Sequence, residues 1–182
     1  MARTATMQTE GRRKARKILE VPQEEVCSKY SYWNRGYYSS MNDPDKIAAH
    51  VQDIAKLRQD ATILYHLWPG NELMGREVIC LGHPFPSFIS PSEIFINAHI
   101  YMVRRLVLVR LDFSGRAFPT PSEIEITRFI VERCRQIEID LADHVVISDH
   151  GVFSFYKEGL LYLDKKDRPQ PVGISLATNR MQ

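Results

Sequence analysis

The hydrophobic pattern of the chain alternates between a helical period and the pattern of buried strands. Four apolar residues recur at helical spacing behind an Asp-Pro pair, which can cap a helix and fill its first turn: Ile47, Val51, Ile54 and Ala55. We expect this helix to run from residue 43 to about residue 58. Strands at residues 61–67 and 73–81 should follow, joined by a turn at residues 68–71.

Two similar segments mark the starts of the next two helices. Ser90-Pro-Ser-Glu93 and Thr120-Pro-Ser-Glu123 each place a hydroxyl three residues before a glutamate, which is the pattern of a capping box. These segments predict helices that end near residues 104 and 137. Residues 106–109 are continuously apolar, as in a central strand covered on both faces.

Two further strands, at about residues 143–148 and 152–156, complete the pattern. Helices that alternate with strands in this order pack on the faces of a sheet. We therefore expect an α/β domain over residues 42–163, preceded by an arm (residues 1–41) and followed by a tail (residues 164–182).

Charge is distributed unevenly along the chain. The net charge of the chain is +2. Residues 1–20 hold six cations and two anions, a net charge of +4, so residues 21–182 carry a net charge of −2. The body is therefore not a basic nucleic-acid-binding domain, and any phosphate contact belongs to the arm. The arm's cations cluster at Arg12, Arg13, Lys14, Arg16 and Lys17. We consider two interpretations of the arm, a solvated segment and a weak nucleic-acid contact through residues 1–38.

Aromatic residues are concentrated just before the domain. Five of the nine residues in the segment 30–38 are Tyr or Trp. Such rings can stack on bases, but a short segment with few charges more often packs on the domain surface. We favour packing.

Cysteine content and hydropathy indicate a cytoplasmic protein without membrane contact. No apolar run approaches the ~18 residues that a membrane span needs, and no secretory signal is present. The three cysteines, Cys27, Cys80 and Cys134, form no CxxC unit, which suits a reducing compartment. We expect Cys80 and Cys134 to be core residues.

Polar residues with candidate chemistry follow the central strand. Arg110 and Asp112 are two residues apart in this strand, so their side chains lie on the same face at its carboxyl end. Open sheets tend to bind ligands at that end. Glu123 lies in the first turn of the next helix, which begins beside that end. We expect these three side chains to meet.

Three segments carry a resemblance to a known family: Asp112–Gly115, Pro119–Thr127, and the Asp-His, Ser-Phe and Glu-Gly pairs within residues 143–159. Together they resemble the C-terminal domain of the RadC family, in the JAB/MPN (JAMM) metallopeptidase-like superfamily. The resemblance extends over about residues 42–162. It implies a JAB/MPN-like (cytidine-deaminase-like) mixed sheet flanked by helices. RadC-like proteins carry a DNA-repair label and often occur on bacterial mobile elements.

The resemblance also implies a site whose metal ligands are lost. In register, the family's two histidines fall on Arg110 and Asp112, its aspartate ligand on Glu123 and its catalytic glutamate on Asp60, whereas Ser114 is retained. Zinc favours His nitrogen and Cys sulfur, and a guanidinium stays protonated and cannot ligate. We therefore expect no metal and no other cofactor, with the three carboxylates binding Arg110 instead.

Two functions follow from this degenerate site. The first is a non-catalytic RadC-like module, a pseudoenzyme that holds a protein or peptide tail in the cleft. The alternative is a metal-dependent peptidase or isopeptidase-like hydrolase with oxygen ligands for Mg²⁺ or Mn²⁺. Each residue also has a structural explanation. Glu123 is the expected partner in the cap of a helix, Asp60 lies at the start of a strand, and Ser114 can shape a turn.

Overall fold

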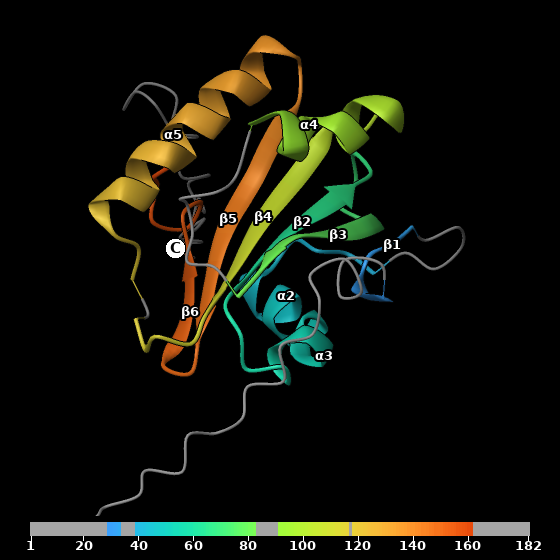
Figure 1. Cartoon of the computed structure of the whole chain (residues 1–182). Helices are drawn as coiled ribbons and strands as arrows, with labels where there is room; N and C mark the ends of the chain where they lie inside the picture. The colour runs from blue at the N-terminus through green and yellow to red at the C-terminus, as the bar shows by residue number, and fades with distance from the viewer. Residues whose placement is uncertain (1–28, 34–38, 83–90, 117, 162–182) are drawn as a thin grey trace, which may run out of the picture.

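The computed structural model describes residues 29–33, 39–82, 91–116 and 118–161. Its centre is a six-stranded mixed sheet in the order β1-β3-β2-β4-β5-β6 (Figure 1). Among these strands β4 and β5 pair in parallel, and the other neighbours are antiparallel. The strands are β1 (Tyr32–Trp33), β2 (Ala61–Leu67), β3 (Leu73–Leu81), β4 (Arg105–Asp112), β5 (Asp140–Ser148) and β6 (Gly151–Ser154).

Helices cover both faces of the sheet, which confirms the expected α/β architecture (Figure 1). The helices α2 (Pro44–His50) and α3 (Gln52–Ala55) lie on one face, and α4 (Pro91–Ile100) and α5 (Pro121–Gln136) lie on the other. Because both faces are covered, β2 is buried at every position and β4 at every position after Arg105.

Alternation along β4 separates two apolar cores. Val107, Val109 and Leu111 pack toward α2 and α3, whereas Leu106 and Leu108 pack toward α4 and α5. Arg110 and Asp112 follow the second set, so they lie on the sheet face that α4 and α5 cover.

The helix predicted over residues 43–58 is two short helices, so that prediction was wrong in its length. Asp43 caps α2 by accepting from the Asp45 N–H at 3.1 Å, as expected. At Val51 the backbone leaves the helical region, with φ −87° and ψ 4°, and this residue divides α2 from α3. The strands β4 and β5 are each longer than predicted, because their charged end residues continue the sheet pairing.

The sheet begins earlier than the predicted domain boundary at residue 42. Tyr32 and Trp33 form β1 and pair with Arg76 and Gly75 of β3, so part of the predicted arm belongs to the sheet. Tyr32 packs against the first core and Trp33 against the second. Packing is thus the structural role of these aromatic side chains.

The crossover helix α5 starts at the predicted capping box. The Thr120 hydroxyl accepts from the Glu123 N–H at 3.3 Å, and Glu123 Oε2 accepts from the Thr120 N–H at 2.7 Å. The corresponding cap at Ser90, the cationic segment 12–17 and the tail 164–182 lie outside the described residues. No helix in the described part of the chain has the length and apolar character to cross a membrane.

Candidate functional site

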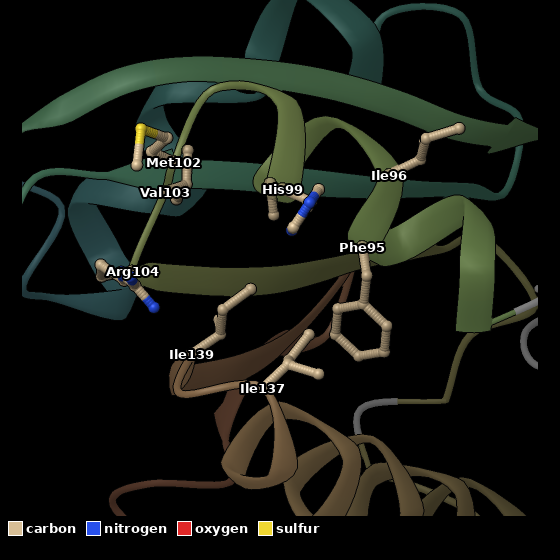
Figure 2. A pocket seen from close by; sticks show the side chains of 9 residues that line it. Phe95, Ile96, His99, Met102, Val103, Arg104, Ile137 and Ile139 are labelled. Atoms are coloured by element: carbon tan, nitrogen blue, oxygen red, sulfur yellow. The ribbon is translucent and has the colours of Figure 1, made fainter.

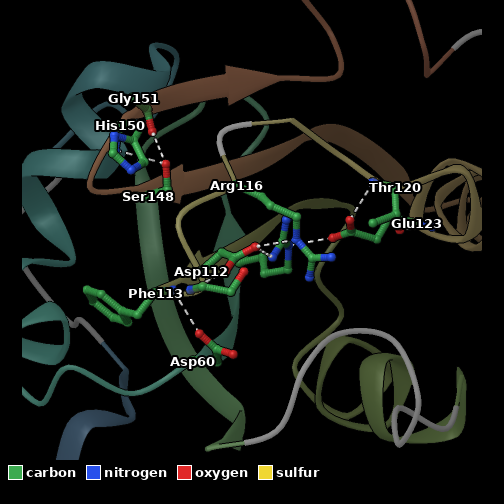
Figure 3. A network of polar contacts seen from close by, with 11 residues as sticks. Asp60, Asp112, Phe113, Arg116, Thr120, Glu123, Ser148, His150 and Gly151 are labelled. Carbon is green, nitrogen blue, oxygen red and sulfur yellow. Dashed lines mark hydrogen bonds and ion pairs between the residues drawn. The ribbon is translucent and has the colours of Figure 1, made fainter. Parts of the chain in front are cut away.

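A buried arginine clamped by two carboxylates occupies the carboxyl end of β4. Arg110 is 5% exposed, and Asp112 and Glu123 are each 1% exposed. Arg110 Nη1 donates to Asp112 Oδ2 at 2.5 Å, and Arg110 Nε lies 2.5 Å from Glu123 Oε1. Figure 3 shows the Asp112 and Glu123 side chains converging on this point from the strand and the helix. The three residues that sequence alternation placed together therefore do meet.

Asp112 is held in its ionised form. Burial alone would raise the pKa of this carboxyl, but hydrogen bonds from Ser114 and Arg110, together with the charge of Arg110, lower it below its usual value. The Ser114 N–H donates to Asp112 Oδ1 at 2.7 Å. Arg116, a mostly exposed side chain, places Nε 3.7 Å from Asp112 Oδ2. The site thus balances two carboxylates against two guanidinium groups.

Glu123 has two structural roles at once. One of its oxygens caps α5 through Thr120, and the other lies against Arg110. The same side chain therefore fixes the start of α5 over the end of β4. Both the capping explanation and the clamp predicted from the sequence are present in the structure.

Asp60 does not belong to this cluster, and the expectation that it binds Arg110 was wrong. Its Oδ1 accepts from the Phe113 N–H at 2.8 Å, and Figure 3 shows the carboxylate directed toward Phe113. Asp60 precedes β2, which is the neighbour of β4. Its carboxylate is therefore committed to holding the backbone just after β4.

A buried hydrogen-bond chain extends the cluster inward, and sequence reasoning missed it. The Thr127 hydroxyl donates to the Glu123 carbonyl at 2.6 Å, so it accepts from His144 Nδ1 at 2.8 Å. Burial, with a smaller effect of the Arg110 charge, lowers the pKa of His144 to about 3, so the ring is neutral. The sequence feature that indicates this hydrogen-bond chain is the four-residue spacing between Glu123 and Thr127, which places both residues on one face of the helix.

Asp143 and His144 do not pair with each other, because neighbouring strand residues point to opposite faces. Ser154 Oγ donates to Asp143 Oδ2 at 2.5 Å, and the Tyr156 N–H donates to Oδ1 at 2.9 Å. Burial raises the pKa of Asp143 to about 6, although these hydrogen bonds oppose the shift. The Asp-His pair is thus two separate structural polar groups.

The donor set does not fit zinc. Within the described ranges, no group of three or more His, Cys, Asp and Glu side chains is arranged to hold a metal ion. The centre of the cluster is a guanidinium, which cannot ligate and would repel a dication. Cys80 and Cys134 are buried core thiols, and burial raises the pKa of Cys134 to about 12.

The mixed six-stranded sheet flanked by helices is consistent with a JAB-type domain. A family model for the RadC-like JAB domain matches residues 41–160, well over half of the chain, and the chain belongs to this family.

Similar curated proteins come from Bacillus species. A UPF0758 protein of Bacillus cereus is 29% identical over 128 residues, and one of Bacillus mycoides is 28% identical over 128 residues. These alignments cover 70% of this chain and 56% of each relative. The chain thus spans about half the length of the curated relatives it matches.

Proposed function

We propose that this chain is a non-catalytic RadC-like JAB domain that binds a protein or peptide tail. The observation that carries the proposal is Arg110, buried between Asp112 and Glu123 at the strand end where the family resemblance places metal ligands. A guanidinium in that position supplies a fixed positive charge and hydrogen-bond donors, but it cannot activate water. In this proposal an ion-pair cluster occupies the position where the family resemblance places the hydrolytic site.

Arg110 has one hydrogen-bond donor that no described residue uses. Its Nη2 is buried and has no hydrogen-bond partner among the described residues. A buried donor without a partner costs about 1–3 kcal/mol, so a carbonyl oxygen that reaches it is favoured. The side-chain carbonyl of a peptide Asn or Gln is a neutral acceptor, and it suits a site in which acidic and basic groups already balance.

The edge strand β6 offers the rest of a peptide-binding surface. It is the last strand in the sheet order, and Val152 within it is 39% exposed. Phe118 is 72% exposed and packs edge-on against Phe153, with ring centroids 5.9 Å apart. Arg110 and Phe153 lie in one cross-strand row through Val146, so they are about 10 Å apart. A peptide added to β6 would lie one strand spacing further out, about 14–15 Å from the Arg110 backbone, so it would approach Arg110 through a long side chain and not through its backbone.

The alternative is a hydrolase that binds Mg²⁺ or Mn²⁺ through oxygen ligands. Two buried carboxylates at one point, Asp112 and Glu123, favour this alternative. It requires Arg110 to leave the cluster, and Asp60 is already committed to the Phe113 N–H. We therefore place this function second. We assign the protein to the cytoplasm, because its three cysteines form no CxxC unit and no framework of paired spacings.

Metal analysis distinguishes the two functions. We expect the purified chain to lack stoichiometric zinc, manganese or magnesium, and to show no peptide hydrolysis when these ions are added. The double substitution Arg110→His and Asp112→His rebuilds a nitrogen pair beside Glu123 and should confer zinc binding measurable by calorimetry. Hydrolysis by the parent chain with added Mn²⁺ would favour the alternative.

Peptide binding is tested with random-peptide display on the full chain. Val152→Lys places a charge on the β6 edge, so peptides selected on the parent should bind this variant at least about tenfold more weakly. Phe129→Lys is the matched control, because Phe129 is 40% exposed but lies on α5. Equal loss in both variants, or no peptides selected at all, would contradict a peptide-binding role for this edge.

A further inference from the structure

An apolar groove lies between α4 and the carboxyl end of α5, away from β6. It encloses about 590 Å³. Figure 2 shows Phe95 and His99 on one side of it and Ile137 and Ile139 on the other. Its lining is predominantly apolar, in contrast to the charged cluster at Arg110. The proposed peptide function does not use this surface.

Large apolar side chains are exposed in the lining of the groove and beside it. Ile96 and Ile100 occupy the same face of α4, four residues apart, and are 58% and 62% exposed. Met102 follows in the turn after α4 and is 78% exposed. Large apolar side chains exposed together in this way commonly mark an interaction surface. Ile96 and Met102 line the groove and Ile100 does not, so the face carries both a hollow and an exposed side chain of the size that fills one.

The rim of the groove carries opposite charges next to each other. Arg104 lines the groove, and its Nη1 lies 3.5 Å from Glu138 Oε2. The two side chains are 56% and 85% exposed, so both are accessible to a partner. This surface carries a cation beside an anion and an exposed apolar side chain beside a hollow. It is therefore complementary to the same surface on a second copy of the chain.

We infer that this face binds a second copy of the chain. In a two-fold symmetric dimer the same patch is used by both copies, so each side chain faces its partner's complement. Ile100 of one copy then enters the groove of the other, where Ile96 and Met102 line the wall, and Arg104 of one copy faces Glu138 of the other. The dimer buries side chains that the monomer leaves in water.

Sedimentation of the full chain tests the inference through charge reversal. The parent should dimerise, whereas Arg104→Glu and Glu138→Arg should each dimerise at least about tenfold more weakly, because like charges then face each other. An equimolar mixture of these two variants should recover dimerisation, because one copy now offers two anions and the other two cations. Recovery in the mixture is specific to a contact between copies.

Ile100→Lys provides an independent variant that keeps the fold. A cation in the last turn of a helix is favoured by the helix dipole, so we expect a folded monomer. Phe118→Lys, at a position that is 72% exposed and outside the groove, should dimerise as the parent does. A parent that stays monomeric at its highest soluble concentration, or a mixture that associates no better than either variant alone, would overturn the inference.

Discussion

Arg110 is a stabilising residue at the position where the family resemblance places a metal ligand. Arg110→Ala would leave Asp112 and Glu123 facing each other, each 1% exposed. Removing one partner of a buried ion pair costs about 3–5 kcal/mol, because the remaining charges are uncompensated. We expect a loss of this size in the free energy of unfolding, measured by urea denaturation at pH 7.

The pH dependence of this loss follows from the carboxylates. In the parent the pKa of Asp112 is lowered in the folded state, so its contribution to stability is present above the unfolded pKa and is lost as the pH falls. In the variant the remaining carboxylates are relieved when they protonate. The difference between parent and variant should therefore shrink from pH 7 to pH 4. Arg58→Ala, which breaks the exposed pair with Asp149, is the control and should change stability far less.

Asp143 should show the opposite dependence. Its pKa is raised to about 6 in the folded state, so its contribution to stability is fully present below the unfolded pKa of about 4 and is lost as the pH rises through 6. Asp143→Asn keeps a hydrogen-bonding group of the same shape beside Ser154 and Tyr156. We expect the variant to gain about 2–3 kcal/mol over the parent at pH 7 and to lose that advantage near pH 4.

Thermal denaturation across this pH range measures the Asp143 effect. Asp149→Asn is the matched control, because a hydrogen bond from Arg58 lowers the pKa of Asp149. That control should cost stability at pH 7 and not at low pH. A parallel pH profile for Asp143→Asn and the parent would contradict the raised pKa.

At the level of elements, the attachment of β1 depends on a glycine in β3. A Cβ at Gly75 would lie 2.7 Å from the Tyr32 carbonyl oxygen and 2.9 Å from the Trp33 ring. Trp33 also packs against His66 and Tyr101, with ring centroids 4.6 and 3.9 Å away. Gly75→Ala should therefore displace β1 and shift Trp33 fluorescence toward longer wavelengths, read in a Trp68→Phe background. Gly70→Ala is the control, because its Cβ would meet only the flexible end of Glu72.

Elements with a local chemical signature were predicted well from the sequence. The capping residues Asp43 and Thr120 gave correct helix starts, and the apolar run before Arg110 gave the central strand. The short strand β1 was missed, because its pairing with β3 depends on residues more than forty positions away. Asp60 was misassigned for a related reason, since its partner is a backbone N–H that carries no sequence signal.

At the scale of the whole molecule, we propose that the N-terminal arm supplies any nucleic-acid contact. Residues 1–20 carry a net charge of +4, and the remainder of the chain carries −2. Deleting these residues should weaken DNA binding uniformly across sequences and reduce its salt dependence. Fluorescence anisotropy at several salt concentrations measures both effects. Sequence-specific binding that persists in the deletion would locate the contact in the folded domain instead.

The parallel pairing of β4 with β5 has a consequence for folding kinetics. Arg105 and Asp140 are paired across 35 residues, whereas β2 and β3 form a hairpin closed by a short turn. Closing the longer loop requires α5 to dock, and we expect the contact between Arg110 and Glu123 to form as that crossover is completed. Loss of Arg110 should then raise the unfolding rate in a chevron plot and leave the folding rate nearly unchanged. The ion pairs of Arg110 would therefore determine how long the native state persists rather than how quickly it is reached.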